Sequence, residues 1–229
     1  TDVQPNLRSL VGDEGVRFKH GYVNHPVCCV SRSSLLTGKL SHNTYVVNNS
    51  ATRGRYPGNC TSPEWAANME PYALAVHMRD AGYENSIYMG KYMNDAHMPG
   101  SVPAEFENDT FAYIPPGWGE WYGLQGNSKC EQLVPRFARP PMYLTRLCPL
   151  WRVRADYNYS VSNNGVQEKH GYDYTEDYFT LQLAKRASKF LSEHGERKAA
   201  AAAAGQDRPP FFMMIGTPAA HANFIPPPQ

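Results

Sequence analysis

Residues 71–89, PYALAVHMRDAGYENSIYM, place a helical pattern directly before a strand pattern. The first part predicts a helix over Pro71–Ala81, and Gly82 follows it as a stop signal. The predicted helix face consists of residues spaced three and four apart: Leu74, His77, Met78 and Ala81. The second part, Tyr83–Met89, predicts a buried strand. A helix that leads into a buried strand is typical of α/β domains, so we predict an α/β fold.

Three further elements are predicted on the N-terminal side of this unit. Pro5–Glu14 favours a short amphipathic helix, because a proline suits its first turn and a glycine follows its end. Val16–Val23 alternates enough to predict a strand. Cys28–Gly38 is expected to be a loop that runs into a helix, with the helix starting at Ser31.

The C-terminal side adds a hairpin, a helix and a strand. Tyr157–Gly165 predicts a hairpin strand that ends in an Asn-Gly turn. Tyr174–His194 predicts a helix with Thr175 as its N-cap. The predicted apolar face of that helix consists of Ala184, Ala187, Phe190 and Leu191. Phe211–Ile215 is a continuous apolar run, which is typical of a central parallel strand.

Other segments predict loops. Asn48–Pro63 is rich in Asn, Gly and Pro, and Pro99–Trp151 is rich in Pro, Gly and aromatic residues. A long irregular stretch in a compact domain indicates an active-site loop region. Ala199–Ala204 is a run of alanines with nothing specific to bury. We therefore predict a low-complexity insertion in a surface loop at about residues 198–207.

Length and charge narrow the class of protein. A chain of 229 residues is long enough for one domain with a sizeable core. Its 22 Lys and Arg against 21 Asp and Glu give a net charge of +1, so we expect no nucleic-acid partner. No run of roughly 18 apolar residues is present, so we expect no membrane span.

Cysteines and glycosylation sequons bear on the compartment. The cysteines are Cys28, Cys29, Cys60, Cys130 and Cys148. Their odd number fits poorly with a closed set of disulfides unless one cysteine has another role. The Asn-x-Ser/Thr sequons, which are candidate glycosylation sites, are at Asn48, Asn59, Asn108 and Asn158. This number of sequons favours a protein of the secretory pathway.

The segment that carries chemistry is residues 28–38, CCVSRSSLLTG. From the residues alone, Cys28 and Cys29 could be a buried or disulfide-bonded pair and Arg32 a surface charge. The segment closely resembles the signature of type I sulfatases, Cys-x-Pro-Ser-Arg followed by Thr-Gly at fixed spacing. A helix that begins here would also direct its N-terminal amides and dipole at an anion.

The resemblance implies that a formylglycine-generating enzyme oxidises Cys28 to formylglycine. A hydrated aldehyde carries two hydroxyls on one carbon. One attacks sulfur and displaces the alcohol, and the other collapses to the aldehyde and expels sulfate. Arg32, a permanent cation with a rigid fork of donors, would orient the hydrate.

Two further blocks are similar to those of N-acetylglucosamine-6-sulfatases. Residues 90–94, GKYMN, resemble a segment whose lysine contacts the sulfate, which implies this role for Lys91. Residues 210–221, PFFMMIGTPAAH, resemble a strand that leads to a histidine. The implied role of His221 is to contact the sulfate and assist the leaving group. Without the resemblance, Lys91 could be an exposed turn residue and His221 a structural loop residue.

The resemblance implies a mixed, mostly parallel sheet between helices, as in alkaline-phosphatase-like sulfatase domains, of which residues 1–229 are an incomplete part. The implied reaction is hydrolysis of sulfate monoesters, with a sulfated glycan or aryl sulfate as substrate, and N-acetylglucosamine-6-sulfate units as the expected target. The family binds Ca²⁺ through oxygen ligands that include the residue derived from Cys28. The other ligands are not recognised in this chain, so we expect the chain alone to be inactive. The expected location is lysosomal or extracellular.

One departure from the family pattern leaves other functions open. Val30 stands where the family has proline, which bears on whether Cys28 is oxidised. The alternatives are a non-catalytic homologue that binds sulfated glycan, and a truncated product without activity. A third is a phosphotransfer enzyme of the same superfamily with a Ser or Thr nucleophile, which Cys28 and Arg32 disfavour.

Overall fold

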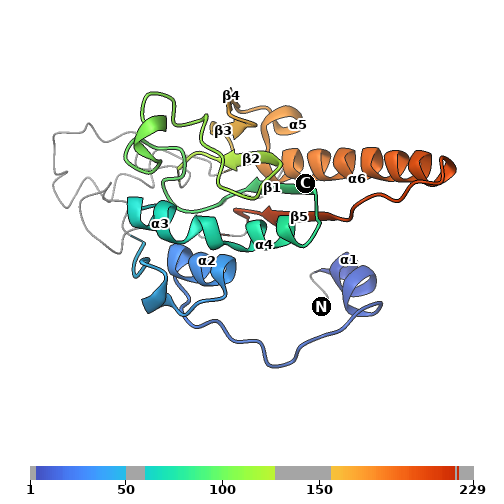
Figure 1. Ribbon diagram of the computed structural model, residues 1–229, viewed down its shortest axis with the longest axis horizontal. Helices are drawn as coiled ribbons and strands as arrows, with labels where there is room; N and C mark the ends of the chain where they lie inside the picture. The colour runs from blue at the N-terminus through green and yellow to red at the C-terminus, as the bar shows by residue number, and fades with distance from the viewer. Residues whose placement is uncertain (1–3, 50–59, 127–155, 220, 222–229) are drawn as a thin grey trace.

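The computed structural model describes residues 4–49, 60–126, 156–219 and 221 (Figure 1). The helical elements are α1 (Pro5–Leu7), η1 (Arg8–Gly12), α2 (Cys28–Thr37), η2 (Ser41–Asn43), α3 (Pro63–Asn68), η3 (Glu70–Tyr72), α4 (Leu74–Asp80), η4 (Ala104–Phe106), α5 (Tyr174–Asp177) and α6 (Phe179–Ala203). The strands are β1 (Asn85–Gly90), β2 (Glu120–Leu124), β3 (Ser160–Asn163), β4 (Val166–Lys169) and β5 (Phe211–Gly216).

The described strands form one mixed sheet in the order β4-β3-β2-β1-β5. Strand β1 pairs in parallel with both β2 and β5, whereas β3 is antiparallel to β2 and to β4. The predicted α/β fold with a mixed sheet is therefore confirmed. Since β1 and β5 run in the same direction, their carboxyl ends meet at one edge of the sheet.

Helices cover both faces of the sheet, with α2–α4 on one side and α6 on the other (Figure 1). The alternation of side chains along each strand divides the core into two layers. Tyr88 and Trp121 pack toward α2 and α3, and their rings stack with centroids 5.1 Å apart. Met89 and Tyr122 point the other way and pack against Phe179 and its neighbours in α6.

The predicted elements at the centre of the sheet are confirmed with shifted ends. Tyr83–Met89 is found as β1 and Phe211–Ile215 as β5. Strand β5 is an edge strand among the described residues rather than a central one. Its residues Phe211–Met214 are half-buried and Ile215 is exposed. The hairpin β3–β4 turns at Asn164 and Gly165, both at positive φ as the Asn-Gly pair predicted.

Several helix predictions need correction. Helix α4 buries Ala75 and Val76, so the predicted face through Leu74 and His77 is wrong. The N-cap before α5 is Asp173, not Thr175. Its carboxylate accepts bonds from the backbone N–H groups of Thr175 and Glu176, at 2.8 and 2.9 Å. The buried residues of α6 lie along one stripe: Phe179, Leu183, Ala187, Phe190 and His194.

The alanine run is helical, which corrects the predicted surface loop at 198–207. Helix α6 continues through Ala203 and projects beyond the sheet (Figure 1). The first half of α6 is packed against the sheet, so the unfavourable nucleation of the helix is already accomplished there. Alanine has the highest helix propensity, so the alanine run extends the helix at little cost in free energy. The helix ends before Gly205, which adopts a positive φ of 69°.

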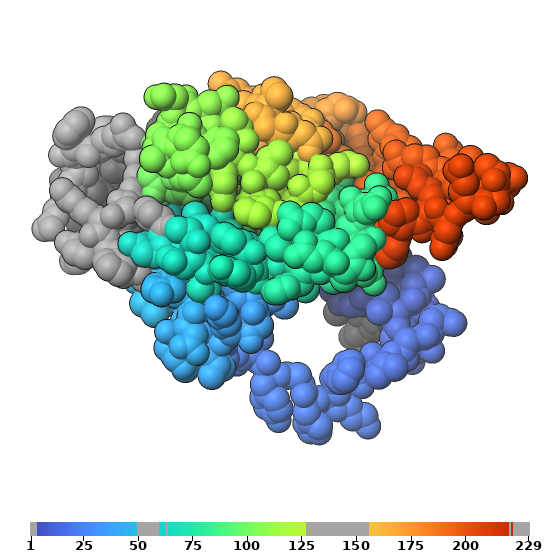
Figure 2. Space-filling view, viewed as in Figure 1, coloured from blue at the N-terminus to red at the C-terminus, as the bar shows by residue number. Residues whose placement is uncertain are grey.

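The predicted strand Val16–Val23 is wrong, and a strand was missed. Val16, Phe18 and Tyr22 lie in irregular backbone and are highly exposed. Alternation alone does not supply a ladder partner, and this segment has none among the described residues. The space-filling view shows the N-terminal segment arching away from the body (Figure 2). Strand β2 lies within 99–151, which we predicted to be irregular, and residues 127–155 lie outside those described.

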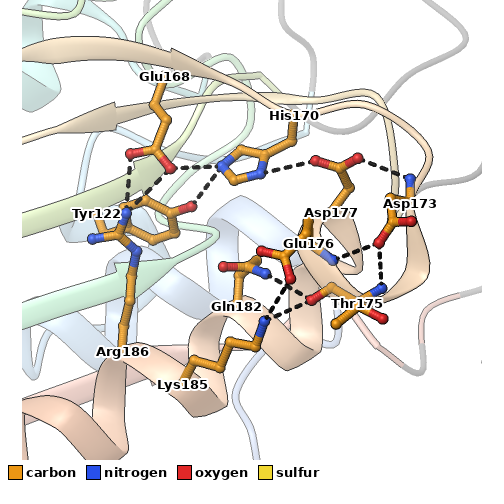
Figure 3. Close-up of polar contacts among 10 residues, drawn as sticks. All are labelled: Tyr122, Glu168, His170, Asp173, Thr175, Glu176, Asp177, Gln182, Lys185 and Arg186. Carbon is orange, nitrogen blue, oxygen red and sulfur yellow. Dashed lines mark hydrogen bonds and ion pairs between the residues drawn. The ribbon is translucent and has the colours of Figure 1, made fainter.

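The hairpin is joined to α5 and α6 by a polar cluster around His170 (Figure 3). His170 Nε2 lies 2.8 Å from Glu168 Oε1 and 3.0 Å from the Tyr122 hydroxyl, and Nδ1 lies 3.4 Å from Asp177 Oδ1. Burial opposes ionisation of Glu168, but the Arg186 guanidinium beside it brings the pKa of Glu168 below its usual value. Arg186 and Glu168 therefore form an ion pair that links the hairpin to α6.

No helix among the described residues is long and apolar enough to cross a bilayer.

The close approach of β1 and β5 predicts a strong effect of Gly90→Ala. Gly90 has a φ of 103°, and a Cβ there would collide with the backbone of Gly216. We expect the free energy of unfolding, measured by chemical denaturation, to fall by about 1–3 kcal/mol or more. Gly195→Ala is the control, because Gly195 lies in α6 with open space around it. This change should raise the free energy of unfolding by about 0.5–1 kcal/mol. Equal effects of the two changes would contradict the close packing of β1 and β5.

Candidate active site

Helix α2 begins at Cys28 itself, three residues before the predicted start. Val27, the N-cap, is extended and offers no side-chain cap. The backbone N–H of Cys29 is instead capped by Asn49 Oδ1 at 2.8 Å. At the other end, Gly38 adopts a left-handed conformation, and its N–H donates to Ser34 O at 2.8 Å. Residue 28 therefore lies at the positive end of the helix dipole.

The two adjacent cysteines have different roles. Cys29 is fully buried and forms a disulfide with Cys60, while Cys28 is a free thiol. The backbone N–H of Asn94 donates to Cys29 Sγ at 3.2 Å. The disulfide thus joins the start of α2 to the segment before α3, and the bond from Asn94 links the start of α2 to the segment that follows β1. Cys130 and Cys148 lie outside the described residues.

Lys91 and Arg32 meet where β1 ends. Lys91 directly follows β1 and is only 5% exposed, so the alternative of an exposed turn lysine is wrong. The Arg32 guanidinium donates to the backbone carbonyls of Lys91 and Tyr92, at 2.6 and 3.4 Å. Arg32 is therefore anchored to the β1 end rather than being a free surface charge.

Buried Glu70 fixes the same segment from within the core. Its carboxylate accepts from Trp65 Nε1 at 2.9 Å and from the Tyr113 hydroxyl, and it also bonds the side chain of Tyr92. Burial raises the pKa of Glu70, although these donors oppose the rise. The residue next to Lys91 is thus held through its side chain as well as its backbone.

His221 reaches Cys28 from the end of β5. Its backbone N–H donates to Pro218 O at 2.9 Å, in the turn that follows the strand. Its Nε2 lies 4.0 Å from Cys28 Sγ. The structure therefore brings together the four residues singled out from the sequence: Cys28, Arg32, Lys91 and His221.

The electrostatics of these residues favour negative charge at position 28. Burial opposes ionisation of the Cys28 thiol, but a bond from His221, the Lys91 ammonium and a bond from Asn49 together lower the pKa of Cys28 below its ordinary value. Burial lowers the pKa of Lys91 as well, and nearby Arg32 adds to that effect. Two cations held this close together favour an anion between them.

The described residues do not form a calcium site. Ca²⁺ takes six to eight oxygen ligands, commonly with several carboxylates. No group of three or more His, Cys, Asp or Glu side chains suited to a metal occurs in the part of the chain that the structure describes.

The candidate glycosylation sites differ in accessibility. Asn108 and Asn158 are exposed, whereas Asn48 is half-buried beside Asn49. Asn59 lies outside the described residues.

Asn49 is the site residue that sequence reasoning missed. It lies 20 positions after the helix N-terminus that it caps. The only sequence signal is the presence of Asn, a residue type that caps helices well, in a loop expected to be close to the site.

Comparison with known proteins identifies the family. A model of the sulfatase family matches residues 1–229. The chain belongs to the sulfatase family. It is 34% identical over 223 residues to the N-acetylglucosamine-6-sulfatase of Homo sapiens, covering 97% of this chain and 31% of the relative. It is 32% identical over 228 residues to a putative extracellular sulfatase Sulf-1 homolog of Caenorhabditis elegans, covering 100% of this chain and 24% of the relative. This sulfatase chain thus spans about a quarter to a third of the length of these relatives.

A solved structure supports the fold assignment. It is a complex with the substrate D-glucosamine-2-N,6-O-disulfate, and it aligns with a TM-score of 0.56 at 19% identity. The alignment covers 97% of this chain and 31% of the solved chain. The alkaline-phosphatase-like sulfatase fold expected from the sequence is confirmed for a partial domain.

The charges around Cys28 predict its reactivity in protein produced without formylglycine-generating machinery. We expect the Cys28 thiol to be alkylated at lower pH than an ordinary thiol, because its thiolate is stabilised. Lys91→Met should move the alkylation midpoint to higher pH, while Lys39→Met, at the far end of α2, should not. Peptide mass spectrometry after alkylation at a series of pH values measures both. A midpoint unaffected by Lys91→Met would contradict the electrostatic account.

Proposed function

We propose that the protein hydrolyses sulfate monoesters, with 6-O-sulfate on N-acetylglucosamine units of glycosaminoglycans or related glycans as the substrate. The observation that carries this proposal is the convergence of Cys28, Arg32, Lys91 and His221 where α2 begins and β1 and β5 end. The relatives named as N-acetylglucosamine-6-sulfatases, and the solved complex with a 6-O-sulfated glucosamine, support the choice of sugar.

Each residue has a role in the proposed reaction. Cys28, once oxidised to formylglycine and hydrated, would supply one hydroxyl that attacks sulfur and displaces the sugar alcohol, and a second whose collapse to the aldehyde expels sulfate. The Lys91 ammonium binds the sulfate oxygens, and Arg32 orients the group at position 28. The exposed imidazole of His221 lies beside position 28 and donates a proton to the departing sugar oxygen. We propose no step that involves Ca²⁺, because the described residues do not provide its ligands.

The proposed compartment is the secretory pathway, with a lysosomal or extracellular destination. The Cys29–Cys60 disulfide supports an oxidising compartment, as do the sequons. Two relatives are named as extracellular sulfatases.

A second candidate is a homologue that binds sulfated glycan without turnover. Val30 in place of proline favours it, since it bears on oxidation of Cys28. Binding of the 6-sulfated sugar without release of sulfate, by protein made from the complete gene, would select this candidate.

The effect of His221→Ala should depend on the leaving group. A sugar alcohol leaves poorly without a proton, whereas an activated aryl group needs none. We expect turnover of N-acetylglucosamine-6-sulfate to fall by about 10²–10⁴-fold, with a much smaller loss on an aryl sulfate. Lys91→Ala should impair both substrates alike, because both contain sulfate.

Steady-state kinetics on both substrates measures these effects, with exposed His42→Ala as the control. Equal losses on the two substrates for His221→Ala would reduce this residue to a sulfate contact. Good aryl activity with no cleavage of the sugar would reject the substrate assignment.

Val30→Pro should improve conversion of Cys28 to formylglycine. Val30 is the third residue of α2, and its N–H has no acceptor among the described residues, so proline removes no bond there. We expect partial conversion with valine and more with proline, measured by mass spectrometry of the peptide that contains residues 28–32. Val30→Ala is the control and should not help. Complete conversion of the Val30 protein would show that this position is not limiting.

A further inference from the structure

His97 is a buried histidine in the segment that follows Lys91, and it takes no part in the proposed reaction. The residue is only 2% exposed, and its ring stacks on Phe111 with centroids 6.0 Å apart. His97 Nδ1 lies 2.9 Å from Thr110 O, and Nε2 lies 2.9 Å from Trp121 Nε1. The ring therefore joins the segment after β1 to strand β2 and to the loop that precedes β2.

These two partners fix the protonation state of the His97 ring. The indole N–H of Trp121 can only donate, so Nε2 must present its lone pair to it. The backbone carbonyl of Thr110 can only accept, so Nδ1 carries the proton and donates it to this bond. A second proton, on Nε2, would face the indole N–H and break the bond to Trp121. The contacts therefore require a neutral imidazole.

Burial acts on the ring in the same direction as these bonds. It is the largest cause that lowers the pKa of His97 from 6.5 to about 4, although the bond to Thr110 opposes the decrease. The side chains that contact the ring, Trp121 and Phe111, do not titrate. The charged residues on the elements packed around it are Lys91, Asp95, Glu105, Glu107, Asp109 and Glu120. None of these carboxylates forms an ion pair with His97 in the part of the chain that the structure describes, so an imidazolium there has no counter-charge.

The Trp121 ring connects His97 to the candidate active site. It stacks on Tyr88 with centroids 5.1 Å apart, and the Tyr88 hydroxyl donates to Lys91 O. The same carbonyl accepts from Arg32 at 2.6 Å. The backbone of His97 has a positive φ of 58°, a strained conformation that persists only while its surroundings hold it. Loss of the contacts of the His97 ring would therefore free the segment that carries Lys91.

We propose that neutral His97 is a positioning residue for Lys91 and Arg32, and that its protonation in acid releases the segment after β1 and impairs the site. The positioning role rests on the proposed sulfatase function, whereas the pH-dependent contact does not. Because its folded-state pKa is lowered, the stability that His97 contributes is complete above pH 6.5 and is lost as the pH falls toward about 4. The acidic interior of a lysosome weakens this contact, so the extracellular destination suits the site better.

Glutamine at position 97 separates this role from simple packing. Its side-chain oxygen can accept from the Trp121 N–H, and it stays neutral at every pH. His97→Gln should therefore keep the site at neutral pH and lose the sensitivity to acid. Trp121→Phe is a second variant, which keeps an aromatic ring and removes the N–H that opposes a proton on Nε2. His77→Gln is the matched control, because His77 is exposed in α4.

The first measurement needs no sulfatase activity. Hydrogen exchange of the peptide that contains residues 91–98 is followed by mass spectrometry at pH 7.5 and pH 5, in protein from the complete gene, and the rates are corrected for the intrinsic effect of pH. Opening of the segment restores the ordinary pKa of His97, so protection in the parent should fall by about 30-fold between these pH values. The decrease should be much smaller in His97→Gln and Trp121→Phe, and parent-like in His77→Gln.

Either of the first two variants decides the question if the other does not fold. Protection that does not change with pH in the parent, or that falls as much in the folded variant as in the parent, would overturn the proposal.

The second measurement is the pH dependence of kcat/KM on an aryl sulfate, whose leaving group needs no proton from His221. At pH 4 about half of the folded parent carries a protonated His97, so the ratio of His97→Gln activity to parent activity should rise about two-fold from pH 7 to pH 4. A purely structural role would lower activity by the same factor at every pH. A ratio that stays constant would therefore overturn the positioning role. If the parent protein lacks sulfatase activity, the proposed function fails, and hydrogen exchange still decides the contact.

Discussion

The parallel pairing of β1 with β5 is the constraint on which the rest of the site depends. Gly90 and Gly216 lie opposite each other at the strand ends, and Lys91 N–H donates to Gly216 O at 2.8 Å. Only glycine permits this approach at position 90. The contact sets Lys91 and the turn that leads to His221 side by side, and Arg32 then bonds the carbonyl of Lys91. Helix α2 is thereby placed with its N-terminus at the sheet edge.

The arrangement places positive charge in a buried region, where little solvent can stabilise it. Lys91 is buried near Arg32, which is costly for both cations without an anion. The N-terminus of α2 adds its dipole at the same place. Such a site favours an anion, and in the proposed reaction this anion is the sulfate group that the residue at position 28 attacks. The disulfide of Cys29 and the buried carboxylate of Glu70 keep this geometry fixed before substrate arrives.

Sequence reasoning succeeded where one continuous segment carries the signal. Strand β1 and the hairpin turn at Asn164 lie within short motifs. The four candidate site residues also lie within short motifs, and the structure places them close together, while their roles stay predictions. It failed where a distant partner decides the outcome: Val16–Val23 alternates without a strand to pair with, and strand β2 is too short to stand out among glycines and prolines. Asn49 was missed for the same reason, because its role exists only once its loop is folded against the start of α2.

The most direct test of the central claim is to trap the covalent intermediate at position 28. Protein from the complete gene, expressed with formylglycine-generating machinery, is mixed with N-acetylglucosamine-6-sulfate, quenched in acid and digested. Mass spectrometry of the peptide around residue 28 should reveal one added sulfate on the residue derived from Cys28, in the parent protein and not in Cys28→Ala. Release of sulfate with Cys28 still an unmodified thiol, or with the sulfate attached to another residue, would contradict the account.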